Sequence, residues 1–105
     1  MEHLSIKELE TLLGAVRHYG AMDQEVKAME ELGELIQALG KHLNCARDED
    51  PETVQAVDDH VAEEMADVQI MLEQLKIILN NHARVDAWAH EKLARLAARI
   101  DGEAH

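Results

Sequence analysis

The spacing of apolar residues constrains the fold of this chain most strongly, because it follows the period of an α-helix through most of the sequence. Apolar side chains recur every three or four residues, as an amphipathic helix requires. One such series comprises Met29, Leu32, Ile36, Leu39 and Leu43. The chain has only one proline and five glycines in 105 residues, too few for a fold of many short strands and turns. We therefore expect an all-α fold.

Capping signals divide the chain into four predicted helices joined by short connections. Ser5, with Glu8 three positions later, forms a capping-box pattern in front of the first helix. Asp23 is the expected cap of the second helix, and Asp50 followed by Pro51 begins the third. The predicted helices cover about residues 5–19, 24–43, 52–79 and 84–100, with a candidate break in the third near 57–60. We predict a four-helix bundle that forms a single domain over residues 1–105.

The apolar stripes of these helices define the expected core. In the second helix we expect the series from Met29 to Leu43 to be buried. The third helix has the stripe Val61, Met65, Val68, Leu72, Leu75 and Leu79. The last helix has the stripe Val85, Ala89, Leu93, Leu96 and Ile100. Because Phe is absent and Tyr19 and Trp88 are the only aromatic residues, the core must be aliphatic, with Trp88 as its expected anchor.

The charge balance excludes some classes of partner. Ten basic residues against twenty-two acidic ones give a formal charge of −12. Such a chain is a poor candidate for binding duplex nucleic acid or an anionic membrane surface, but it is compatible with cation binding. Cys45 is the only cysteine, so no disulfide framework is expected. No stretch resembles a membrane span or a signal peptide, and we expect a soluble cytoplasmic protein.

Two acidic stretches repeat the same pattern on the second and third predicted helices. They read Glu30-Glu31-Leu32-Gly33-Glu34 and Glu63-Glu64-Met65-Ala66-Asp67. Residues three apart lie about 60° apart around a helix, so the second and last carboxylates of each stretch point the same way. Packed face to face, the helices would bring together Glu31, Glu34, Glu64 and Asp67. Four converging carboxylates need a cation to remain ionised, and oxygen ligands favour Mg²⁺ or Mn²⁺.

These carboxylates are open to other interpretations. A single Glu-Glu-x-x-Glu is usually a solvated helix face, but two copies that border apolar stripes favour a site. We expect Glu63 to face solvent, whereas Glu30 either serves a second metal or orients a water. A di-iron bundle would need Glu-x-x-His pairs, and none of the seven histidines has a Glu three positions before it. The scattered histidines also lack the spacing of zinc ligands.

Three basic residues are candidates for binding phosphate. Lys27 lies one turn before Glu31, so it either contacts a phosphate or pairs with Glu31. Lys92 and Arg95 belong to a basic edge of the last helix. They either bind a triphosphate or balance acidic neighbours and the helix C-terminus.

At these residues the chain resembles the MazG-like, all-α nucleoside triphosphate pyrophosphohydrolase superfamily. The paired motif of that family matches Glu30-Glu31-Leu32-Gly33-Glu34 and Glu64-Met65-Ala66-Asp67, and the similarity covers about residues 23–100. The resemblance implies that Mg²⁺, with Mn²⁺ as a substitute, is held by Glu31, Glu34, Glu64 and Asp67. It gives Glu30 the role of an accessory catalytic carboxylate. It also implies that Lys27 or Lys92 stabilises the charge on the leaving pyrophosphate, which makes Lys27 a catalytic candidate beside Glu30.

The resemblance further implies a reaction and an assembly. The family cleaves a nucleoside triphosphate between its α and β phosphates, giving the monophosphate and pyrophosphate, and its members form homodimers or homotetramers. Canonical dNTPs, dUTP, modified nucleotides and phosphoribosyl-ATP are all substrates within the family, and no base-reading pattern is visible in this chain. The alternative from a different class is a non-catalytic helical interaction module whose acidic faces serve solubility.

Overall fold

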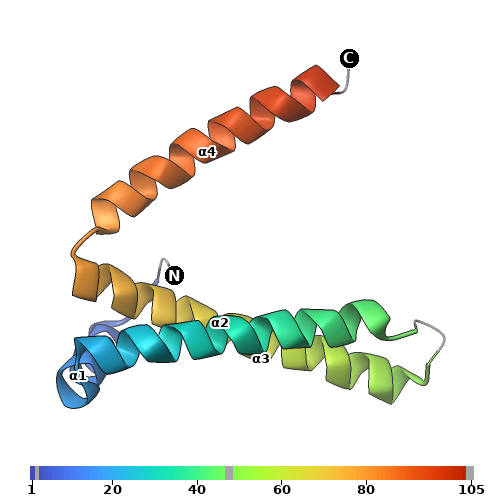
Figure 1. The fold of residues 1–105 in the computed structure, drawn as a ribbon, viewed down its shortest axis with the longest axis horizontal. Coiled ribbons are helices and arrows are strands. Elements are labelled where there is room, and N and C mark those ends of the chain that lie inside the picture. The colour runs from blue at the N-terminus through green and yellow to red at the C-terminus, as the bar shows by residue number, and fades with distance from the viewer. Residues whose placement is uncertain (2, 47–48, 104–105) are drawn as a thin grey trace.

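The computed structural model describes residues 1, 3–46 and 49–103. Within these residues the chain forms four helices and no strand, which confirms the all-α prediction (Figure 1). The helices are α1 (Ile6–Tyr19), α2 (Ala21–Asn44), α3 (Pro51–Leu79) and α4 (His82–Glu103). None of the helices in the described ranges has the length and hydropathy needed to cross a membrane.

Two helix starts follow the capping signals. The Ser5 hydroxyl accepts a hydrogen bond from the Glu8 amide at 3.0 Å, and the Glu8 carboxylate accepts one from the Ser5 amide at 3.0 Å. This reciprocal pair confirms the predicted capping box of α1. At the start of α3, the Asp50 carboxylate accepts hydrogen bonds from the Thr53 amide at 2.9 Å and from its hydroxyl at 2.7 Å. Pro51 is the first residue of α3, as predicted.

Other helix boundaries differ from the prediction. α2 begins at Ala21 instead of after Asp23, because Gly20 turns the chain within one residue at φ 93°. Asp23 lies in the first turn of α2, where the helix dipole favours a carboxylate. α3 runs unbroken through residues 57–60, and α4 is longer than predicted at both ends. Asn80, in the left-handed region at φ 49°, ends α3.

α2 and α3 form an antiparallel hairpin, and α1 packs against it (Figure 1). The buried residues of the two hairpin helices are Gln24, Ala28, Glu31 and Ala38 of α2 and Glu64, Val68, Met71 and Gln74 of α3. Within the buried layer, the Gln24 amide donates a hydrogen bond to the Gln74 side-chain carbonyl. Near the connection between α2 and α3, His42 Nδ1 lies 3.0 Å from Asp58 Oδ1. Half of the residues buried at this contact are therefore polar.

The predicted core stripe of α2 is wrong. Met29, Ile36 and Leu43 are 64%, 70% and 80% exposed, and Leu32 and Leu39 are exposed as well. α3 packs instead against the neighbouring face of α2, where alanines and two polar residues are buried. The predicted stripe of α3 is only partly correct, because Val68 is its one buried member and Met71, outside the stripe, is buried too. The spacing thus identified an apolar face of α2 without identifying what covers it.

The predicted core stripe of α4 is also wrong. No described residue of α4 is buried, and Trp88, the expected core anchor, is 52% exposed. In the described part of the chain α4 contacts α3 alone, and it diverges from the hairpin (Figure 1). The radius of gyration is 17.4 Å. A compact domain of this length would have about 13 Å.

Candidate metal centre

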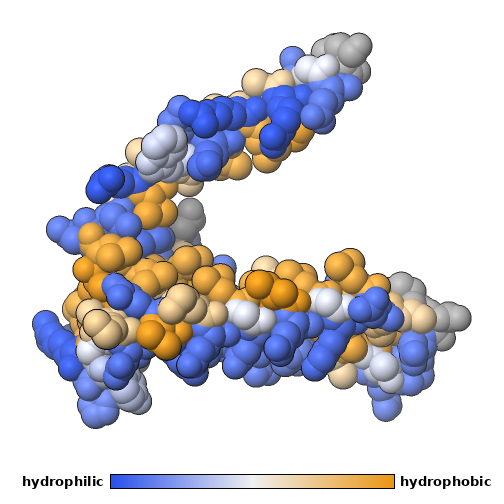
Figure 2. Space-filling view, viewed as in Figure 1, coloured by the Kyte–Doolittle hydropathy of each residue, from blue (hydrophilic) through white to orange (hydrophobic). Residues whose placement is uncertain are grey.

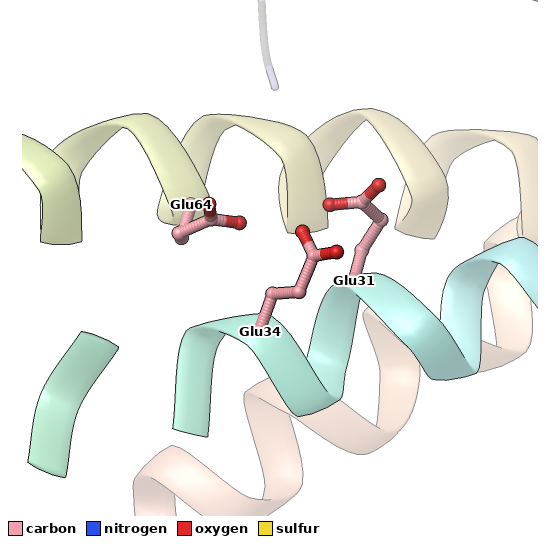
Figure 3. A group of neighbouring side chains, drawn as sticks. All are labelled: Glu31, Glu34 and Glu64. Atoms are coloured by element: carbon pink, nitrogen blue, oxygen red, sulfur yellow. The ribbon is translucent and has the colours of Figure 1, made fainter. Parts of the chain in front are cut away.

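Three carboxylates from two helices meet in the hairpin. Glu31 and Glu34 of α2 and Glu64 of α3 each offer one oxygen, and these oxygens lie within 4.8 Å of one another. Figure 3 shows the three side chains directed into the space between the helices. Glu63, Glu64 and Asp67 form a second group, in which one oxygen of each side chain lies within 4.8 Å of the other two. Glu64 belongs to both groups and connects them.

Two of these carboxylates are buried without full compensation. Glu31 is 7% exposed and Glu64 is 6% exposed. The Oε2 atom of each is buried and has no hydrogen-bond partner within the part of the chain that the structure describes. Leaving a buried polar atom unpaired costs about 1–3 kcal/mol, and more when the group is charged. A bound cation would remove this cost at both oxygens.

Lys27 provides part of the missing positive charge. Its Nζ atom lies 3.0 Å from Glu31 Oε1 and 3.9 Å from Glu30 Oε2. The pairing with Glu31, one of the two roles considered for Lys27, is thus present. This hydrogen bond and the charge of Glu31 raise the pKa of Lys27 above its usual value. Lys27 is paired with Oε1 of Glu31, and Glu31 Oε2 has no partner among the described residues.

The charges of the cluster act on Glu34, which is exposed. The negative charge of Glu31, followed by desolvation and the charge of Glu64, raises the pKa of the Glu34 carboxyl above its usual value. A higher pKa means that the ionised form of Glu34 is disfavoured beside its neighbours. The local field therefore favours the arrival of a positive charge.

The donor set fits a hard divalent cation. Both groups consist of carboxylates alone, with no histidine or cysteine among them. Oxygen donors of this kind suit Mg²⁺ and Mn²⁺ better than zinc or copper. Because residues three apart share a side of a helix, one turn of α2 supplies two of the ligands. The residues present thus fit the ion that the sequence pattern predicts.

The structure brings most of the predicted ligands together. Glu31, Glu34 and Glu64 form one group, and half-buried Asp67 joins it through Glu64. Glu63 is exposed, as expected, but it also lies within reach of Glu64 and Asp67, and the sequence pattern did not select it as a ligand. Its signal was its place beside Glu64 in the acidic repeat.

The predicted catalytic residues lie at the outer side of the cluster. Glu30 is exposed, and its carboxylate lies beside the Lys27 ammonium. Both residues line an open cavity of about 520 Å³ at the α1–α2 junction, together with Tyr19, Asp23, Gln24 and Val26. This cavity adjoins the cluster because Lys27 borders the cavity and contacts Glu31.

The predicted phosphate ligands of α4 are not brought to the cluster. Lys92 and Arg95 are exposed on a helix that diverges from the hairpin (Figure 1). Arg95 pairs with Glu91 of its own helix at 2.7 Å. Lys92 lines a shallow cavity beside Trp88.

Comparison of the chain with protein-family models, with curated proteins and with solved structures finds no match. The family suggested by the motifs therefore stays a prediction, and the chemistry of the carboxylate cluster is the basis for assigning a function.

Proposed function

We propose that the chain binds Mg²⁺ or Mn²⁺ at Glu31, Glu34, Glu64 and Asp67, and that it hydrolyses a nucleoside triphosphate to the monophosphate and pyrophosphate. The observation that carries the proposal is the pair of buried, unpaired carboxylate oxygens on Glu31 and Glu64 within one group of carboxylates. A bound divalent ion supplies phosphate charge neutralisation and a nucleophilic hydroxide near neutral pH. The sequence resemblance supports the choice of reaction.

Residues beside the cluster would bind the substrate and orient water. The Lys27 ammonium, half of whose side chain is exposed, offers donors to a phosphate oxygen while it stays paired with Glu31. Glu30, on the exposed side, accepts a hydrogen bond from the attacking water and orients it. The cavity of about 520 Å³ that both residues line gives the nucleotide a place next to the cluster.

Lys92 and Arg95 are proposed as further phosphate ligands. Because α4 diverges from α2, Lys92 and Arg95 reach a phosphate bound at the carboxylate cluster only when α4 lies against an α2–α3 hairpin (Figure 1). The homodimer or homotetramer that the family resemblance implies is one way to bring this about.

The test is pyrophosphate release from a panel of NTPs, dNTPs and phosphoribosyl-ATP, with Mg²⁺, with Mn²⁺ and with EDTA. We expect metal-dependent formation of monophosphate and pyrophosphate, and loss of turnover in Glu64→Gln. Glu10→Gln makes the same chemical change at an exposed position of α1 and serves as the matched control. If calorimetry detects Mn²⁺ binding but no nucleotide is cleaved, the cation site stands and the hydrolase proposal is refuted. If neither is observed, both are refuted.

The second candidate is a non-catalytic helical interaction module. The specific observation in its favour is the exposure of the apolar stripes of α2 and α4, which suits a surface that binds another protein. Under this function Glu31→Gln would leave partner binding unchanged. Under the enzyme function the same substitution would abolish turnover.

A further inference from the structure

The chain leaves more of its surface uncovered than a folded monomer of its mass. Its accessible surface is 8187 Å² at a mass of 11.8 kDa. A compact monomer of that mass exposes about 5,900 Å², so about 2,300 Å² per chain is in excess. Two chains that buried this excess against each other would form an interface in the range of obligate homodimers, about 2,000–5,000 Å² in total.

Much of the uncovered apolar surface lies along α2. We define the α2 stripe as Met22, Val26, Met29, Leu32, Ile36, Leu39 and Leu43. Every member is at least 42% exposed. Successive members are three or four residues apart, which is the spacing that packs one helix against another over several turns. The stripe extends over about 30 Å at 1.5 Å per residue.

A second apolar surface lies on α4. We define the α4 stripe as Val85, Trp88, Leu93, Leu96 and Ile100, all of them exposed. Figure 2 shows hydrophobic side chains along both borders of the open space between α4 and the α2–α3 hairpin, which we call the mouth. Two apolar surfaces thus border a space that the chain itself leaves open.

The distribution of charge indicates which surfaces meet. Residues 21–79, which include the hairpin, carry fifteen acidic and four basic residues, whereas α4 carries four of each. Two hairpins packed against each other would bring two strongly negative surfaces together. The placement of α4 on a hairpin instead combines apolar stripes and sets basic residues such as Lys92 and Arg99 beside acidic helices.

We propose that a second copy of this chain fills the mouth, with the α4 stripe of each copy packed on the α2 stripe of the other. Such an exchange is two-fold symmetric, because each copy gives and receives the same surface. It covers both stripes at once and brings α4 into contact with an α2 helix, which it lacks within its own chain. The proposal stands whether or not the carboxylate cluster is catalytic.

The first test is the mass and shape of the chain in solution, by light scattering after gel filtration and by small-angle X-ray scattering. We expect a mass of about twice 11.8 kDa for the unaltered chain. Ile36→Glu in the α2 stripe and Leu96→Glu in the α4 stripe should each yield helical monomers and weaken association at least tenfold. Leu96 contributes to no buried layer in the monomer, so its replacement leaves the hairpin intact. Gln37→Glu adds the same charge at the next, exposed position of α2 and should remain dimeric.

The second test distinguishes exchange of α4 from other pairings. In a Cys45→Ser background, chains with Ile36→Cys are mixed with chains carrying Leu96→Cys and oxidised. The proposal expects a mixed disulfide dimer. Efficient cross-linking of Ile36→Cys chains to one another, without the mixed product, would overturn it. A monomeric unaltered chain with a radius of gyration of about 13 Å would overturn it too, because α4 would then cover its own hairpin.

Discussion

Replacement of Glu64 by glutamine should reverse the order of stability of the two proteins when a cation is added. Glu64 belongs to both carboxylate groups, is 6% exposed and has a buried oxygen without a partner. Glutamine keeps the shape, removes the charge and adds an amide that can donate to a neighbouring carboxylate. Without metal, relief of the unpaired buried group should raise the free energy of unfolding by about 1–2 kcal/mol.

A bound cation should act in the opposite direction. At a cation concentration of 100 times Kd, binding to the folded state alone stabilises a protein by about 2.7 kcal/mol. The unaltered chain should gain this amount, whereas Glu64→Gln, which lacks a ligand common to both groups, should gain little. The unaltered chain should then be the more stable of the two by about 1 kcal/mol, the difference between these two estimates.

The assay is thermal unfolding followed by circular dichroism, in EDTA and in Mn²⁺ or Mg²⁺. One protein concentration must be used throughout, because association also shifts Tm. Each kcal/mol corresponds to about 4–8 °C in Tm for a small domain. Glu10→Gln, at an exposed position, should behave as the unaltered chain in both buffers. A Glu64→Gln chain that is less stable in EDTA, or an unchanged order with metal, would refute the reasoning.

Three further predictions concern pH, the buried amide pair and the first helix cap. Because the pKa of Glu34 is raised in the folded chain, its ionisation lowers the free energy of unfolding as pH rises above the ordinary pKa of 4.5. Without metal, Glu34→Gln should therefore have a higher Tm than the unaltered chain at pH 7. The difference in Tm should shrink as the pH is lowered towards 4.5. Gln24→Ala leaves the Gln74 amide buried and unpaired, so the free energy of unfolding measured in urea should fall by about 1–3 kcal/mol. Replacement of both Gln24 and Gln74 by leucine should recover much of this loss. Ser5→Ala removes the capping hydroxyl of α1 and should lower the free energy of unfolding by about 1 kcal/mol in the same assay.

The sequence predicted what depends on nearby residues. The start of α1 behind Ser5 and the start of α3 behind Asp50 follow from hydrogen bonds within one turn, and both predictions were correct. The pairing of Glu31 with Glu34 on one side of α2 follows from helix geometry alone. The meeting of these residues with Glu64 required only that the two acidic helices pack against each other.

The sequence did not reveal which face of a helix is covered by which partner. Met29 and Ile36 have the spacing of core residues, but α3 packs against the face that carries Ala28 and Ala38. The spacing of apolar residues indicates that one face of a helix is apolar, but it does not indicate whether the same chain or another molecule covers that face. The early start of α2 depended on Gly20 adopting a positive φ, which its identity permits but does not require.

The polar pairs of the hairpin also set the alignment of the candidate metal site. In each of three polar pairs between α2 and α3, the two residue numbers add up to 98 or 100. The pairs are Gln24 with Gln74, Glu34 with Glu64, and His42 with Asp58. The three pairs therefore belong to one antiparallel alignment of α2 and α3. A slip of one helical turn, about 5.4 Å, would place Glu64 opposite Ala38 and break the buried amide pair. The amide pair thus sets the alignment of carboxylates about ten residues away in each helix. A one-residue insertion between Glu64 and Gln74 should therefore separate the candidate metal ligands. A longer connection between α2 and α3 should leave them aligned.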